Sequence, residues 1–292
     1  MSTTFLLFQV LNGITFAALL FLLGSGFTLI FGLMRVSNLT HGGFYLVGGY
    51  IGLSVIRATN ASLGSLSFFA GLAAAAVSVG VMGVLIERGL LSRVRGQGNS
   101  EVLLTVGLAF ILGDLSLVIW SGDPVSIPAP DFLRTSATIG PLTYPLYRFF
   151  VVLVGVIVGA VLWYLQTHTR LGAIVRAGVD DIEMVDALGI NIKLVFSGVF
   201  MVGAALAGLT GVMGGAFLSL YPGADWEILL FGLVVVIIGG LGSLEGAIVG
   251  ALTVGLLDTF GKALFPELSY FTIFGPMAIM LALRPRGLFG RN

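Results

Sequence analysis

Long apolar stretches separated by short polar loops run through the whole chain. The stretches long enough to cross the roughly 30 Å hydrocarbon core of a bilayer are residues 8–33, 65–86, 102–120, 146–166, 194–218 and 269–283. Two further regions are irregular. Residues 42–56 are short for a crossing, and residues 228–260 are too long for one helix and contain the polar run GGLGSLEG. If that run is a turn, the pattern predicts an all-α bundle of about eight to nine membrane segments, with some helices broken or short.

Composition sets the class of protein. Hydrophobic residues make up 57% of the chain and charged residues only 10%, against about 25% charged residues in a typical soluble domain. We therefore expect one transmembrane domain, residues 1–292, surrounded by a lipid bilayer. The net charge is zero and there is no cysteine, so neither a basic nucleic-acid surface nor a thiolate metal site is expected.

The distribution of lysine and arginine predicts which ends of the helices face the cytoplasm. Basic residues accumulate in short cytoplasmic loops because they resist translocation. With the N-terminus outside and the C-terminus in the cytoplasm, ten of the 14 basic residues lie inside: Arg35, Arg88, Arg93, Arg95, Arg170, Arg176, Lys193, Arg284, Arg286 and Arg291. The loops 121–145 and 219–226 are then external. We expect a multi-pass protein of a bacterial inner membrane.

Small residues four positions apart recur along the apolar stretches. Such spacings let helix backbones approach closely and pack by dispersion. They occur at Gly48/Gly52, Gly155/Gly159, Gly203/Ala207/Gly211 and Ala247/Ala251/Gly255. We interpret them as packing seams of a compact bundle.

The two irregular regions resemble each other. Residues 31–52 and 236–255 both pass from an apolar helix through a polar turn with serine (Ser37, Ser243) into a helix rich in small residues. Irregular backbone at membrane depth needs protein or a water-filled cavity to satisfy its polar groups, and broken helices in transporters line the substrate path. The candidate pathway-lining residues are Asn38, His41, Gly42, Gly240, Gly242 and Ser243. The alternative is that both regions are ordinary cytoplasmic hairpin turns.

Isolated charged residues lie within the apolar stretches. Asp114 would cost roughly 2.5–3.5 kcal/mol in lipid without a partner or water, so it is either hydrogen-bonded to a neighbouring helix, interfacial, or a further pathway-lining candidate. Asp258 and Lys262 are four residues apart and are expected to form an exposed pair at a helix end. His41 beside a glycine turn is more typical of a hydrogen bond to the backbone than of a proton relay.

No constellation of catalytic residues is present. The run GLLDTFGKA at 255–263 has Ala263 where a phosphate loop needs serine or threonine. Metalloprotease and nucleophile-elbow motifs are also absent. We expect no catalytic residue, no metal site, no cofactor and no ATP hydrolysis in this chain.

The polar loop 167–193 is predicted to contain a short amphipathic helix. Asp180 is the expected N-cap, with Glu183 three residues later as in a capping box, and Gly189 is expected to end the helix in the left-handed conformation. The candidate contact residues are Asp181, Ile182, Met184, Val185, Ala187, Leu188 and Gly189. A helix this short needs a groove to stabilise it. The alternative is a helix resting on the membrane, which the acids of this segment disfavour.

The same regions carry a resemblance to a known family. Residues 12–52, 169–192 and 231–257 resemble the membrane permease subunits of ATP-binding-cassette (ABC) importers for branched-chain amino acids, the LivH-like half. The family's IxNFAHG turn here reads VSNLTHG, with Leu39-Thr40 in place of Phe-Ala, and permeases for urea and short amides are closely similar. A stand-alone secondary transporter or a passive channel is a further alternative, although only Asp114 is a fair coupling-ion ligand.

The resemblance implies a division of labour among several subunits. It implies a periplasmic or extracellular solute-binding protein, a second, LivM-like permease subunit and ATP-binding subunits on the cytoplasmic face. It also implies that the loop at 176–192 is the segment that couples the permease to those ATPases. This chain would then be a non-enzymatic half of the translocation pathway.

Overall fold

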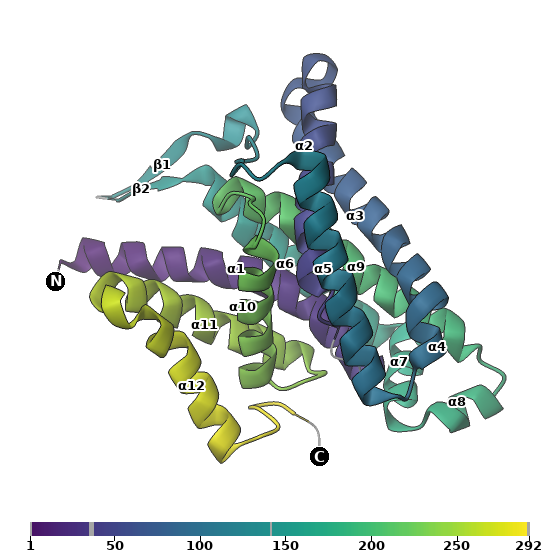
Figure 1. Cartoon of the computed structure of the whole chain (residues 1–292). Coiled ribbons are helices and arrows are strands. Elements are labelled where there is room, and N and C mark those ends of the chain that lie inside the picture. Colours follow the sequence, from purple (N-terminus) through teal and green to yellow (C-terminus); the bar gives the residue numbers. More distant parts are fainter. Residues whose placement is uncertain (1, 35–37, 141, 291–292) are drawn as a thin grey trace.

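The computed structural model describes residues 2–34, 38–140 and 142–290, and most of them are helical (Figure 1). The long helices are α1 (Thr3–Met34), α2 (His41–Leu63), α3 (Ser67–Ile86), α5 (Gly98–Trp120), α6 (Leu146–His168), α9 (Ile192–Phe217), α10 (Ala224–Gly239), α11 (Leu244–Leu264) and α12 (Ser269–Leu283). The short ones are α4 (Ser92–Val94), α7 (Arg170–Asp180) and α8 (Ile182–Ala187). The predicted all-α membrane bundle is confirmed.

Within the described residues, seven helical stretches are long and apolar enough to cross a membrane. One of them, His41–Val94, contains both α2 and α3, which reverse direction at Gly64, where φ is 53°. With those two arms taken separately and the 16-residue α10 included, the fold agrees with the predicted eight to nine segments. Residues 42–56 are not a short segment, because α2 is 23 residues long.

The predicted turn between residues 239 and 246 is confirmed. The chain leaves α10 at Gly240 (φ 108°) and passes through Gly242 (φ 81°) before α11 begins. These left-handed conformations are easily adopted only by glycine. The two helices then run side by side so closely that a Cβ on Gly239 would clash with the carbonyl oxygen of Gly246.

Helix α1 lies at the centre of the bundle and packs against α11, α9, α6 and α10. All of its residues from Leu19 to Thr28 are buried. The predicted small-residue seams mark close helix contacts. For example, a Cβ on Gly48 of α2 would clash with the backbone of Gly208 in α9, and one on Gly255 of α11 would lie 2.6 Å from the carbonyl oxygen of Gly13.

The loop at 121–145 contains a small β-hairpin that the sequence pattern did not predict. Strands β1 (Ser136–Ile139) and β2 (Leu142–Pro145) are antiparallel, with Ser136 opposite Pro145. Each strand has four residues, too few for alternation to stand out in a chain this apolar. The hairpin lies at the same end of the bundle as the N-terminus (Figure 1).

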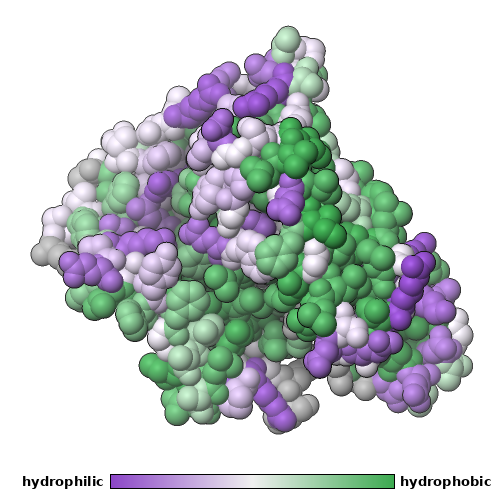
Figure 2. All heavy atoms as spheres, in the orientation of Figure 1, coloured by the Kyte–Doolittle hydropathy of each residue, from purple (hydrophilic) through white to green (hydrophobic). Residues whose placement is uncertain are grey.

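The opposite end of the bundle carries α4, α7 and α8 (Figure 1). Hydrophilic side chains gather over these short elements, and a broad hydrophobic zone lies between them and the hairpin end (Figure 2). This separation fits the predicted clustering of basic residues in cytoplasmic loops. Which end faces the cytoplasm stays a prediction.

Candidate functional site

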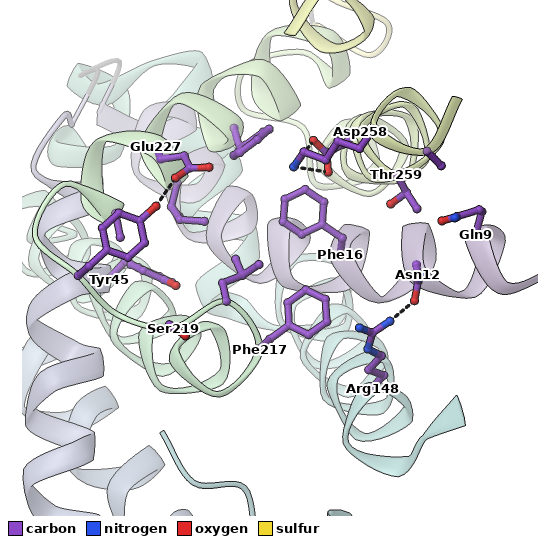
Figure 3. A pocket seen from close by; sticks show the side chains of 17 residues that line it. Gln9, Asn12, Phe16, Tyr45, Arg148, Phe217, Ser219, Glu227, Asp258 and Thr259 are labelled. Atoms are coloured by element: carbon purple, nitrogen blue, oxygen red, sulfur yellow. Dashed lines mark hydrogen bonds and ion pairs between the residues drawn. The ribbon is translucent and has the colours of Figure 1, made fainter. Parts of the chain in front are cut away.

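A polar cavity of about 450 Å³ opens at the hairpin end of the bundle (Figure 3). We call it the Arg148 cavity. Its walls come from the first half of α1, Tyr45 near the start of α2, the start of α6, the end of α9 and the segment after it, the start of α10 and the end of α11. A volume of this size is typical of small-molecule sites, which range over about 300–1,000 Å³. This cavity was not predicted from the sequence, because its residues are far apart along the chain.

Arg148 is held at one side of the cavity by an amide and two aromatic rings. It donates a hydrogen bond to Asn12 Oδ1 (Figure 3). Its guanidinium carbon lies 5.1 Å from the ring centroid of Phe217 and 5.4 Å from that of Tyr144. Among the described residues no carboxylate pairs with it.

Acidic side chains lie at another part of the cavity wall. Glu227 accepts a hydrogen bond from the hydroxyl of Tyr221. That bond and partial burial raise the pKa of Tyr221 to about 12, so the hydroxyl keeps its proton and remains a donor. Asp258 pairs with Lys262, with 2.8 Å between Oδ1 and Nζ. This pair was predicted to be exposed, and for Asp258 that is wrong, because it is only 5% exposed on α11, a helix that packs against α1 and α10.

A second polar cavity, of about 770 Å³, lies towards the other end of the bundle. We call it the Ser243 cavity. The end of α1, α7, the turn between α10 and α11 and the C-terminal segment line it. Of the predicted pathway residues, Gly242 and Ser243 line this cavity. Gly240 is buried against Phe289 and Gly290 instead.

The residues predicted from the first turn are buried in helix contacts and line neither cavity. The backbone N–H of Thr40 donates to Asn38 Oδ1 at 3.2 Å. His41 Nε2 lies 3.1 Å from the carbonyl oxygen of Leu23, which agrees with the backbone hydrogen bond expected for it. A Cβ on Gly42 would clash with the carbonyl oxygen of Asp225. Ser37 lies outside the described residues, and a pathway role for this turn stays a prediction.

Asp114 is exposed on α5 and makes no hydrogen bond or ion pair with another described residue. Its neighbours Ile111, Leu115 and Val118 are exposed as well. The residue therefore lies outside both cavities in this chain. The predicted bond to a neighbouring helix is not observed among the described residues, and Asp114 lines neither the Arg148 cavity nor the Ser243 cavity.

The loop 167–193 contains two helices instead of the single one predicted. Helix α7 begins at Arg170, where the side chain of Thr169 accepts from the N–H of Gly172 at 3.2 Å. Asp180 is the last residue of α7, so it is not the N-cap of α8 as predicted. Asp181 is that cap, and its carboxylate accepts from the N–H of Met184 at 2.9 Å.

The predicted end of α8 at Gly189 is confirmed. Gly189 has φ of 78°, and its N–H bonds to Asp186 while that of Ile190 bonds to Val185, the pattern of a Schellman motif. The predicted apolar face is divided. Val185 is only 2% exposed and packs into the fold. The exposed members of the candidate set are Asp181, Ile182, Met184, Ala187, Leu188 and Gly189.

An ionic cluster around the buried Glu87 lies where the end of α3 meets α9, and it was not predicted. Glu87, in the π-helical turn Glu87–Leu91 that follows α3, pairs with Arg95 and accepts a hydrogen bond from Ser197 Oγ at 2.7 Å. Ser197 in turn accepts from Arg88 Nε at 2.9 Å. The charges at the end of α3 are visible in the sequence. Their hydrogen-bond partner Ser197 is 110 positions from Glu87, so the contact could not be predicted from the local pattern.

A polytopic helical bundle with polar cavities towards its two ends has the architecture of a membrane transport component. Comparison with known proteins identifies the family. The branched-chain amino acid transport system permease component family matches residues 9–281, and the chain belongs to it.

Curated relatives match over nearly the whole chain. The high-affinity branched-chain amino acid transport system permease protein BraD of Pseudomonas aeruginosa is 29% identical over 97% of this chain and 95% of its own length. LivH of Escherichia coli K12, with the same description, is 27% identical over 100% of this chain and 98% of its own. The ribose import permease RbsC of Haemophilus influenzae is 27% identical over 70% of this chain and 62% of its own. No solved structure matches the chain significantly.

Proposed function

We propose that this chain is the permease subunit of an ABC importer for branched-chain amino acids and forms half of the translocation pathway. The observation that carries the proposal is a pair of polar cavities towards opposite ends of a bundle whose central helix α1 is buried between them. Passage of a solute would then require helices to move, as in alternating access. The substrate class follows from the relatives named for branched-chain amino acids.

The proposed arrangement follows the predicted topology. The N-terminus and the β-hairpin face outwards, where a solute-binding protein delivers the amino acid to the Arg148 cavity. A second, LivM-like permease subunit completes the pathway. ATP-binding subunits dock on the cytoplasmic end and hydrolyse ATP, since this chain has no motif for doing so.

We propose that α7 and α8 form the docking segment for the ATPase. Three exposed apolar side chains are available: Ile182 and Met184 on α8 and Leu188 directly after it. Burying a side chain of this size contributes about 1.5–3 kcal/mol. Two residues after Gly189, the side chain of Asn191 caps α9 by accepting from the N–H of Leu194 at 3.3 Å. A push on α8 would therefore be delivered to α9 and, through Ser197, to Glu87.

Variants of α8 test this proposal in the importer assembled with its ATPase subunits and binding protein. Leu188→Asp removes one apolar contact and is expected to weaken ATPase binding by about tenfold or more, the equivalent of about 1.4 kcal/mol. Gly189→Val places a β-branched residue at positive φ and changes the angle of α8. Pull-down of the ATPase and uptake of labelled leucine are the measurements.

The matched control is Leu66→Asp, since Leu66 is also an exposed leucine, at 63% against 71% for Leu188, but lies in the α2–α3 turn. It should leave ATPase binding unchanged. If Leu188→Asp and Gly189→Val both retain wild-type binding and uptake, α8 is not the docking segment. Solute flux through the chain reconstituted without any ATPase would reject the importer assignment in favour of a channel or a secondary transporter.

A further inference from the structure

The charged groups of the Arg148 cavity balance in number but are separated in space. Arg148 lies on one side, beside Asn12, and Glu227, Asp258 and Lys262 lie on the other (Figure 3). Lys262 and Asp258 form an ion pair whose charges cancel. The net charge on the second side is therefore the negative charge of Glu227. The cavity therefore has a formal net charge of zero and a strong internal polarity.

The guanidinium of Arg148 is positioned to receive an anion. Arginine has five N–H donors. The hydrogen bond to Asn12 comes from Nη1, so further N–H groups of the guanidinium remain for a ligand. The flanking rings of Phe217 and Tyr144 restrict the guanidinium, which lowers the entropy lost when it binds a planar partner. A carboxylate matches the fork of donors in shape and charge.

Apolar side chains lie between the two charged regions. The rings of Phe16 and Phe217 project into the space between Arg148 and Asp258 in Figure 3. Phe231 packs edge-on against Phe16, with 5.4 Å between the ring centroids. Lys262 Nζ lies 5.8 Å from the Phe16 ring and 5.7 Å from the Phe231 ring, so this wall already accommodates an ammonium group.

We infer that the Arg148 cavity is a binding site for the zwitterionic form of an apolar α-amino acid, with Arg148 as the partner of its carboxylate. Because the ammonium group is attached to the carbon next to the carboxylate, it stays close to Arg148 and faces the side of the cavity that carries the negative charge of Glu227, while the apolar side chain lies on the phenylalanine rings. The inference rests on the proposed function and deepens it. Urea, short amides and sugars carry no carboxylate, so they could accept hydrogen bonds from Arg148 but would lack the charged, two-pronged contact that a carboxylate makes.

A reporter cysteine can measure the electrostatic potential in the cavity and show whether a ligand occupies it, since the chain contains no cysteine of its own. Ser219 lines the cavity, and Ser219→Cys is nearly isosteric. In the importer assembled without its binding protein, the reporter is labelled with an anionic and a cationic methanethiosulfonate reagent of similar size. The ratio of the two rates cancels the reactivity of the thiol itself.

Arg148→Gln should shift this ratio roughly tenfold towards the cationic reagent, as expected for removal of one charge at short range. The matched control is Arg134→Gln, since Arg134 belongs to the loop 121–145 but is exposed and paired with Asp131 at 3.0 Å. It should leave the ratio unchanged. Leucine and 4-methylpentanoate, which carry a carboxylate, should slow labelling, whereas isoamylamine and urea should not.

Arg148→Lys separates ligand recognition from a structural role. Lysine keeps the positive charge, so the labelling ratio should stay near that of the parent. It lacks the two parallel N–H donors of the guanidinium, so protection by leucine should weaken severalfold. If leucine protects Arg148→Gln and the parent equally, or if isoamylamine protects as well as 4-methylpentanoate, the inference is wrong. Failure of the proposed function gives a different result, since the unmodified importer would then take up no branched-chain amino acid.

Discussion

The two polar turns that look alike in the sequence occupy different environments in the fold. In the described part of the first turn Asn38, His41 and Gly42 are buried, with His41 fully covered, whereas the turn from Gly240 to Ser243 opens onto the Ser243 cavity. Both follow an apolar helix and precede a helix rich in small residues. The difference shows that a broken helix does not by itself mark a solvent-lined path.

The environment of each turn is decided by elements distant in the sequence. Thr40 Oγ1 donates to the carbonyl oxygen of Thr105 in α5 at 3.0 Å, and α10 covers Gly42. The second turn is held on one side by the C-terminal segment, where Leu288 and Phe289 donate to the carbonyl oxygens of Ile238 and Gly239. The opposite side of the second turn faces the Ser243 cavity.

Replacing one glycine in each turn should give the largest contrast. Gly42→Val drives a side chain into the backbone of α10 and is expected to cost 3 kcal/mol or more, on the order of the larger overpacking penalties. Gly242→Ala meets only Gly32 Cα at 3.0 Å and must adopt positive φ, at a cost of about 1–2 kcal/mol.

The measurement is the yield of monodisperse protein and its thermal unfolding midpoint in detergent. Gly42→Val should give little folded protein, while Gly242→Ala should fold with a moderately lower midpoint. A Gly42→Val protein as abundant and as stable as the parent would show that the first turn is not tightly packed against α10.

The second-largest expected difference between the two turns is their rate of thiol labelling. Asn38→Cys and Ser243→Cys each introduce a single thiol into a chain without cysteine. The thiol at 38 reacts only when the structure opens locally, so a small polar reagent should label it at least about tenfold more slowly than the thiol at 243. Equal rates in the resting importer would contradict the contrast between the turns. A rise at 38 on adding ATP would support the predicted pathway role of the first turn.

Much of the fold could be predicted because helix length and hydrophobicity are local properties. The end of α10 at Gly239 and the left-handed Gly189 follow from residues adjacent in the chain. The Arg148 cavity could not be predicted, since Asn12, Arg148 and Glu227 come together only when α1, α6 and α10 pack. For the same reason Asp258 reads as exposed in the sequence but is covered in the fold.

The start of α8 illustrates how far local signals reach. Asp180 and Asp181 are both good N-cap residues, and the spacing to Glu183 favours the first. In the structure α7 continues through Asp180, so the cap moves by one position to Asp181. Helix α7 was not predicted, and its last turn occupies Asp180, which leaves Asp181 as the residue that can cap α8.

The smallest expected effect concerns how the two helices begin. The side chain of Ser243 caps α11 by accepting from the N–H of Gly246 at 3.0 Å, whereas Thr40 makes no side-chain cap for α2. Ser243→Ala should therefore lower the free energy of unfolding by about 1 kcal/mol, the usual cost of a lost N-cap. Ser243→Thr keeps the hydroxyl and serves as the control, with a midpoint near that of the parent. If thermal unfolding shows no difference between Ser243→Ala and Ser243→Thr, the cap contributes nothing measurable. The C-terminal segment alone then holds the second turn, and the two turns differ only in what covers them.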